Sequence, residues 1–130
     1  MPTQRPPVRI LLVDDDPDQC AYLSFVLSSY PGHRYQIAGV ISSGEVAIAE
    51  GPALMPDLLL IDIHLAGEIN GIEVGAHFRT KLNLPIVFLS ADTSFETLEL
   101  VKNVHPEGFI VKPCDGAHLL TVIRRLTGKG

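Results

Sequence analysis

Short apolar runs alternate along this chain with longer amphipathic stretches. Five runs are apolar enough to be buried strands, and they are Val8–Val13, Tyr35–Ile41, Asp57–Ile63, Pro85–Leu89 and Gly108–Val111. Residues 58–61 are continuously apolar rather than alternating, which is typical of a strand covered on both faces, as in a parallel sheet. The pattern therefore predicts five buried strands separated by helices.

Polar residues mark the starts of helices between these runs. Asp16 stands before Pro17, which places a side-chain acceptor at the N-cap and proline at the first helical position. The capping-box spacing, a cap residue followed three positions later by Glu, recurs further along. The candidate caps are Ser42 with Glu45, Thr93 with Glu96, the looser pair Asn70 with Glu73, and Asp115 alone.

Strands joined by helices imply parallel pairing and right-handed crossovers, so we expect an α/β fold with a doubly wound sheet between two helical layers. A length of 130 residues leaves room for one domain. We expect a short leader at residues 1–7, the domain over residues 8–127 and a tail at residues 128–130.

Composition narrows the function classes. Hydrophobic residues make up 46% of the chain and charged residues 19%, which is not a disordered composition. The formal net charge of −5 argues against direct binding to nucleic acid or to an anionic membrane. No apolar run approaches the roughly 18 residues that a membrane span needs. The two cysteines, Cys20 and Cys114, make no disulfide framework, so we expect reduced thiols and a cytoplasmic location.

Reactive side chains stand where the predicted strands end. Asp14 and Asp15 follow the first run, Asp62 lies near the end of the third, Ser90 follows the fourth, and Lys112 follows the fifth. Ligands of an open parallel sheet bind outside the carboxyl ends of its strands, so we expect these groups to converge. Clustered carboxylates repel one another unless a cation lies among them, and hard oxygen ligands suit Mg²⁺.

Such a site is suited to phosphoryl chemistry. A Mg²⁺ ion and an ammonium group would neutralise phosphoryl oxygens, and the carboxylate of Asp62 can attack phosphorus. A lone Asp after a strand is more often a cap or turn residue, and we interpret Asp16 in that way. The five histidines show no zinc spacing, but His64 is close enough to Asp62 for its side chain to line the pocket.

Four segments, in order, resemble the receiver domain of two-component response regulators, the family that includes the bacterial chemotaxis regulator. These segments are residues 10–17, 56–63, 84–91 and 108–113. The resemblance covers residues 8–127 and implies a flavodoxin-like fold with strand order 2-1-3-4-5. It implies a phosphoacceptor that takes a phosphoryl group from a histidine kinase or a histidine phosphotransfer protein and then switches a surface that binds an unknown downstream protein. It implies no enzymatic activity beyond the domain's own phosphorylation and dephosphorylation.

The resemblance also implies roles for single residues. Asp62 matches the phosphorylated aspartate. Asp14 and Asp15 match the acid pair that, with Asp62 and the backbone carbonyl of His64, holds Mg²⁺. Lys112 matches the lysine that contacts the phosphoryl group.

A second set of matches concerns the switch. Ser90 matches the switch hydroxyl and Phe109 the switch aromatic, and the bond between Lys112 and Pro113 is expected to be cis, which proline permits. The chain departs from many receivers in a loop after Asp62 that reaches its glycine one residue later, and in Cys114 where Phe is common. The last predicted helix lacks the charge pattern of regulators that dimerise through the fourth and fifth helices and the fifth strand.

Two other function classes remain open at this point. A pseudo-receiver would bind a partner without phosphorylation, although the complete set of Asp, Ser and Lys argues against that. A Mg²⁺-dependent phosphatase of the haloacid dehalogenase kind would carry its nucleophile at the end of the first strand, and this chain has no room for a cap domain. The sequence does not separate a stand-alone receiver from part of a larger regulator or hybrid kinase.

Overall fold

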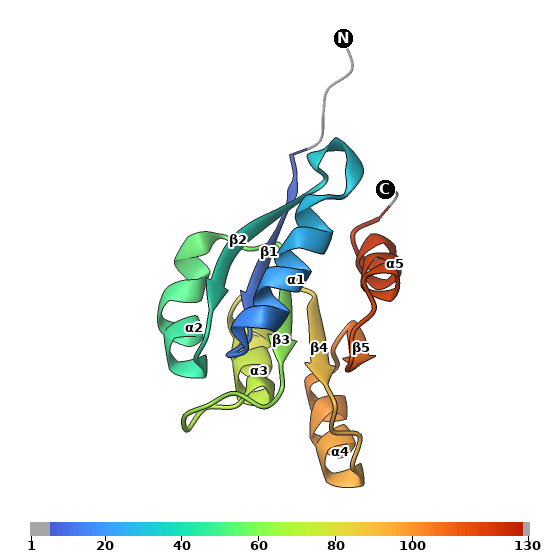
Figure 1. Cartoon of the computed structure of the whole chain (residues 1–130). Coiled ribbons are helices and arrows are strands. Elements are labelled where there is room, and N and C mark those ends of the chain that lie inside the picture. Colours follow the sequence, from blue (N-terminus) through green and yellow to red (C-terminus); the bar gives the residue numbers. More distant parts are fainter. Residues whose placement is uncertain (1–5, 129–130) are drawn as a thin grey trace.

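Five parallel strands form one sheet at the centre of the molecule (Figure 1). They are β1 (Val8–Val13), β2 (Tyr35–Ile41), β3 (Leu58–Asp62), β4 (Ile86–Ser90) and β5 (Gly108–Val111). Their spatial order is β2-β1-β3-β4-β5, which confirms the predicted topology. The computed structural model describes residues 6–128, so most of the expected leader, residues 1–5, and residues 129–130 of the expected tail lie outside it.

Helices cover both faces of the sheet. The helices α1 (Pro17–Ser28) and α5 (Gly116–Leu126) lie on one face, and α2 (Gly44–Glu50), α3 (Gly71–Lys81) and α4 (Phe95–Val104) lie on the other. Two short 3₁₀ helices, Pro31–His33 and Gly51–Leu54, complete the secondary structure of residues 6–128.

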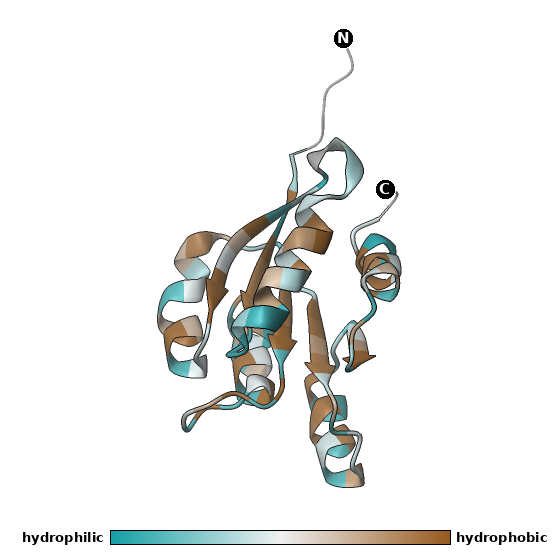
Figure 2. Cartoon of the chain, viewed as in Figure 1, coloured by the Kyte–Doolittle hydropathy of each residue, from teal (hydrophilic) through white to brown (hydrophobic). Residues whose placement is uncertain are grey.

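Alternate side chains of the central strands enter two separate cores. Leu59 and Ile61 pack with the helices of one face, whereas Leu58 and Leu60 pack with those of the other. All four are fully buried, and the hydropathy colouring shows the central strands as predominantly apolar (Figure 2). Burial on both sides explains why the sequence of β3 is continuously apolar.

Three of the predicted helix caps are present. Asp16 accepts hydrogen bonds from two backbone amides at the start of α1, and Asp115 caps α5. Asn70 and Glu73 form a complete capping box at α3, with both reciprocal hydrogen bonds at 2.9 Å. These three starts follow from residue type and local spacing along the chain.

Two predicted caps are wrong by one residue. Ser43, not Ser42, caps α2 by accepting from the amide of Val46. Ser94, not Thr93, caps α4 by accepting from the amide of Thr97. Adjacent hydroxyl residues compete for each cap, and the register in which the helix packs on the sheet decides between them. The predicted ends of β3 and β4 shift by a residue in the same way, so that Ser90 is the last residue of β4.

All five strands run in one direction, so their carboxyl ends meet at one edge of the sheet (Figure 1). The loops that follow β1, β3, β4 and β5 therefore gather at this edge. Both cysteines are free thiols, as the sequence predicts. Over residues 6–128, every helix is too short or too polar to cross a membrane.

Candidate functional site

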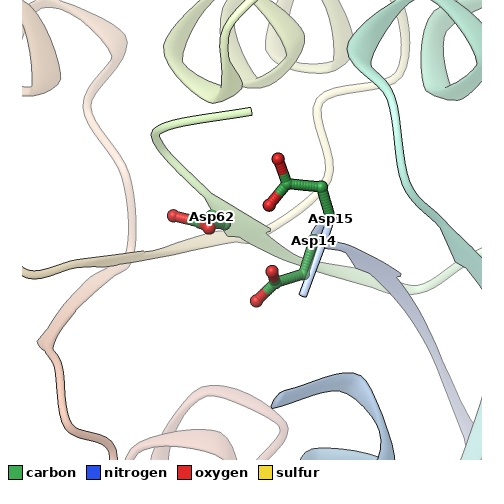
Figure 3. Close-up of side chains that lie close together, drawn as sticks. All are labelled: Asp14, Asp15 and Asp62. Carbon is green, nitrogen blue, oxygen red and sulfur yellow. The ribbon is translucent and has the colours of Figure 1, made fainter. Parts of the chain in front are cut away.

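Three carboxylates meet at the carboxyl edge of the sheet. Asp14 and Asp15 follow β1, and Asp62 ends β3, with one oxygen of each lying within 4.8 Å of the others. Figure 3 shows the three side chains grouped at the ends of the two neighbouring strands. Asp14 is only 2% exposed and Asp62 6%, whereas Asp15 is exposed. The predicted acidic cluster is therefore present, and it opens to solvent on the side of Asp15.

A lysine ammonium lies beside two of these carboxylates. Lys112 Nζ is 3.1 Å from Asp62 Oδ2 and 3.7 Å from Asp14 Oδ2. Burial opposes the charge of Lys112, but the hydrogen bond to Asp62 and the charges of Asp62 and Asp14 outweigh burial, so its pKa is raised. Lys112 is therefore a protonated counter-charge in the site. Its peptide bond to Pro113 is cis.

The environment of Asp14 favours a bound cation. Burial raises the pKa of Asp14, against the opposing effects of the Asp16 amide, which donates to Oδ1 at 2.9 Å, and of Lys112. Asp14 Oδ2 is buried and has no hydrogen-bond partner within residues 6–128. A buried oxygen that accepts no hydrogen bond, beside two further carboxylates, fits a cation, and an all-oxygen donor set is the kind that Mg²⁺ prefers.

Ser90 ends β4, the strand next to β3, and Phe109 lies on β5, the strand next to β4. Ser90 is 1% exposed, and its Oγ accepts a hydrogen bond of 2.9 Å from the amide of Asp92. Phe109 pairs with Phe88 across β4 and β5, is partly buried, and packs against the core beneath α3 and α4. Ser90 is therefore buried at the edge that carries the acidic cluster, and Phe109 packs on the face of the sheet that α3 and α4 cover.

His64 does not lie in the pocket in the way the sequence suggests. Its side chain is 62% exposed, and its Nε2 lies 3.0 Å from Asp92 Oδ2. Asp92 also accepts from the Thr97 hydroxyl at 2.7 Å and from the Ser94 amide at 2.9 Å. The Thr97 and Ser94 hydrogen bonds, with a smaller contribution from His64, hold the pKa of Asp92 well below its usual range.

Sequence reasoning missed the role of Asp92. Its position two residues before Ser94 is a signal for an Asx turn, which spacing alone could have indicated. The contact with His64 joins positions 28 residues apart, and no local pattern predicts it.

Comparisons with known proteins agree with this geometry. The family model for the response regulator receiver domain matches residues 10–124. The DNA-binding response regulator MtrA of Mycolicibacterium smegmatis is 35% identical over 116 residues, which cover 89% of this chain and 49% of that protein. A protein-glutamate methylesterase/protein-glutamine glutaminase of Trichodesmium erythraeum is 32% identical over 114 residues, which cover 85% of this chain and 31% of that protein. The chain thus spans about half, or less, of the length of these curated relatives.

Among solved structures, the signal receiver domain of a modulated diguanylate cyclase from Desulfovibrio desulfuricans matches with a TM-score of 0.83 and 34% identity. The match covers 90% of this chain and 90% of that one. Sequence and fold comparisons therefore lead to one family.

Proposed function

The chain belongs to the response regulator receiver domain family, and we propose that it is a phosphorylation-controlled switch whose phosphoacceptor is Asp62. One observation carries the proposal. Asp62 is a nearly buried carboxylate at the end of a central strand, and Lys112 Nζ lies 3.1 Å from its Oδ2. The amide of His64 donates to the other oxygen, Oδ1, at 3.2 Å. The side chain is thus held in one orientation beside a cation, as a nucleophile for phosphorus needs.

The transfer forms one bond and breaks one. An Asp62 oxygen attacks phosphorus, the phosphorus–nitrogen bond of a phosphorylated histidine breaks, and its electron pair returns to the imidazole nitrogen, which takes up a proton. Lys112 pairs with an oxygen of the transferred group and offsets its charge. A histidine kinase or a histidine phosphotransfer protein is the donor that we propose.

The same site would hold Mg²⁺. The ligands that we propose are the carboxylates of Asp14, Asp15 and Asp62 and the backbone carbonyl of His64. The buried Oδ2 of Asp14, which accepts no hydrogen bond within residues 6–128, supports this assignment. When bound, the ion supplies Lewis-acid neutralisation of the phosphoryl oxygens.

Phosphorylation would act on the surface of the domain through Ser90 and Phe109. In the switched form we propose that the Ser90 hydroxyl leaves the Asp92 amide and donates to a phosphoryl oxygen. The β4–α4 loop follows Ser90, and Phe109 turns further inward. The surface around α4 and β5 then changes, and a downstream protein reads that change.

The names of the relatives describe whole proteins, of which this chain matches half or less. MtrA is by its name a DNA-binding regulator, and this chain matches 49% of it. The methylesterase activity belongs to a protein of which this chain matches 31%. For this chain, with its net charge of −5, we propose phosphoryl transfer to and from Asp62 and docking to a protein rather than to nucleic acid.

The test is the intact mass of the chain before and after incubation with acetyl phosphate and Mg²⁺. We expect wild type to gain one base-labile phosphoryl group and Asp62→Asn to gain none. Asp18→Asn is the matched control, because Asp18 is an exposed acid in the first turn of α1, outside the cluster. It should be labelled like wild type.

Other results identify the rival functions. Equal labelling of Asp62→Asn would show that another residue is the acceptor. A wild-type chain that takes up no phosphoryl group would be a pseudo-receiver. Steady turnover of a generic phosphate monoester would indicate a phosphatase.

A further inference from the structure

The loop between β3 and α3, residues 64–70, is tied to the rest of the molecule at two points near its tip. The amide of Ala66 donates to Asp15 Oδ2 at 2.9 Å, and the amide of Glu68 donates to Glu45 Oε2 at 3.2 Å. In Figure 1 this loop projects beside the start of α2, which carries Glu45. One tie therefore ends on a carboxylate of the acidic cluster, and the other ends on a helix outside it.

The hydrogen bond from the Ala66 amide orients the exposed carboxylate of Asp15. Asp15 is exposed, unlike Asp14 and Asp62, which are buried in the sheet edge. Within residues 6–128, the Ala66 amide is the hydrogen-bond donor recorded for the Asp15 carboxylate. Ligating carboxylates gain affinity when an outer partner fixes their orientation.

The second tie sets where the Ala66 amide lies. Glu45 is the residue predicted to complete a capping box, but Ser43 caps α2, so the Glu45 carboxylate instead reaches the loop. Ile69 packs against the same end of α2, where a Cβ on Gly44 would lie 2.6 Å from the Ile69 carbonyl oxygen. The start of α2 thus supports the loop through one hydrogen bond and one close packing contact.

We propose that Glu45 is a positioning residue for the metal site: by holding the loop, it holds the amide that orients Asp15. The inference rests on the proposed function, because the ion is the one that the phosphoacceptor site would bind. It extends the metal site beyond its ligands to the start of α2. Binding of the ion and order of the loop are then coupled, and each stabilises the other.

Charge and position can be separated at Glu45. Glu45→Gln removes the negative charge but keeps an oxygen that can accept from the Glu68 amide. Glu45→Ala removes both. We expect Glu45→Ala to weaken Mg²⁺ binding by about fivefold, and Glu45→Gln to weaken it by less than about twofold. The first effect is smaller than the roughly 10- to 100-fold loss typical of a direct outer partner, because Glu45 acts on Asp15 only through the loop. Glu50→Ala is the control for charge on α2, because Glu50 is exposed and makes no side-chain hydrogen bond within the described residues.

Gly44→Ala tests the same support without changing any charge. Its new methyl group must displace Ile69, and with it the loop. We expect Mg²⁺ binding to weaken here also, by about threefold or more. This variant keeps the test decisive should Glu45→Ala alter the folding of α2, and thermal unfolding of each variant checks that.

The experiment is a titration with Mg²⁺ alone, without a phosphodonor, followed by the amide resonances of Ala66 and Glu68 and by their hydrogen exchange. We expect ion binding to slow exchange at Ala66 in wild type and in Glu45→Gln, and to slow it less in Glu45→Ala and Gly44→Ala. Equal affinities in Glu45→Ala and Glu45→Gln, or unchanged affinity in Gly44→Ala, would overturn the inference and leave the proposed function intact. A wild-type chain that binds no Mg²⁺ would overturn both.

Discussion

The imidazole of His64 and the carboxylate of Asp92 lie 3.0 Å apart and join the loop after β3 to the loop after β4. Asp92 is also held by the Thr97 hydroxyl, and its amide donates to Ser90 Oγ. Ser90, the residue that we expect to move on phosphorylation, is therefore hydrogen-bonded to the loop between β4 and α4. His64 and Thr97 in turn hold the Asp92 side chain of that loop. This arrangement, together with the charges of Asp14, Asp62 and Lys112, leads to four predictions.

Asp92→Ala should lower the free energy of unfolding clearly, and His64→Ala should lower it little. His64→Ala removes one exposed contact, whereas Asp92→Ala also removes the acceptor of Thr97 and Ser94. The folded-state pKa of Asp92 is below its ordinary value of 3.8, so its ionised form stabilises the fold above that value. This stability is lost as the pH falls through the folded-state pKa.

Urea unfolding at neutral pH and at about pH 3 measures the free energies of unfolding of wild type and the two variants. The deficit of Asp92→Ala relative to wild type should shrink at the lower pH. A deficit that is equal at both pH values would show that the charge of Asp92 does not matter. An equal deficit in His64→Ala would assign the effect to the pair rather than to the loop hydrogen bonds.

Lys112→Met should destabilise the metal-free domain and tighten its binding of Mg²⁺. Without the ammonium, the nearly buried carboxylates of Asp14 and Asp62 face each other without a counter-charge, which costs about 2 kcal/mol. The ion would then no longer compete with Lys112 for these oxygens. Thermal unfolding should show that Lys112→Met is less stable than wild type in EDTA, and that Mg²⁺ largely removes this difference.

Lys102→Met is the control for this variant. Lys102 is an exposed lysine on α4, 3.8 Å from Glu99, and its loss should change neither quantity. Weaker Mg²⁺ binding in Lys112→Met would contradict the electrostatic argument.

Ser90→Ala should still be phosphorylated at Asp62 but should transmit the change poorly to Phe109. The variant loses the acceptor of the Asp92 amide, at a cost of about 1 kcal/mol, and loses the donor that we propose for the phosphoryl oxygen. Burying the Phe109 ring further is worth up to about 3 kcal/mol, so it can bias the switch without making it absolute.

Chemical-shift changes on phosphorylation measure the transmission. They should be smaller around Phe109 in Ser90→Ala than in wild type, and Ser90→Thr, which keeps a hydroxyl, should restore them. Identical changes in wild type and Ser90→Ala would show that Ser90 does not carry the signal.

Asp14→Asn should stabilise the metal-free domain while removing most Mg²⁺ binding. Burial raises the folded-state pKa of Asp14 above 3.8, so the favourable, protonated form persists only at low pH. That stability is complete below the unfolded-state pKa and is lost as the pH rises through the raised folded-state pKa. At neutral pH the ionised carboxylate of Asp14 therefore destabilises the folded state. Asparagine keeps the acceptor for the Asp16 amide and removes the charge.

Unfolding with and without Mg²⁺ tests this prediction. In EDTA, we expect the free energy of unfolding of Asp14→Asn to exceed that of wild type by about 0.5–1 kcal/mol. Excess Mg²⁺ should reverse the order, because the ion stabilises the chain that binds it. A variant that is less stable than wild type in EDTA would show that attraction to Lys112 outweighs burial.

Sequence reasoning was right where the deciding forces act between neighbours along the chain. The apolar run of β3 and the caps at Asp16 and Asn70 depend on hydrophobic period and on spacing, and both can be read locally. The acidic cluster followed from one further rule, that the carboxyl ends of parallel strands meet at one edge. The grouping of Asp62 with Asp14 therefore follows from the sequence and this rule alone.

By itself, then, the sequence determined the five buried strands, the helices between them and the edge at which the reactive side chains gather. Only the tertiary structure decided that Ser43 rather than Ser42 caps α2, that Glu45 reaches the Glu68 amide, and that His64 meets Asp92. These contacts join loops that are far apart in the chain. Their geometry depends on how the helices pack on the sheet, to within a fraction of a helical turn. No spacing rule within one segment contains that information.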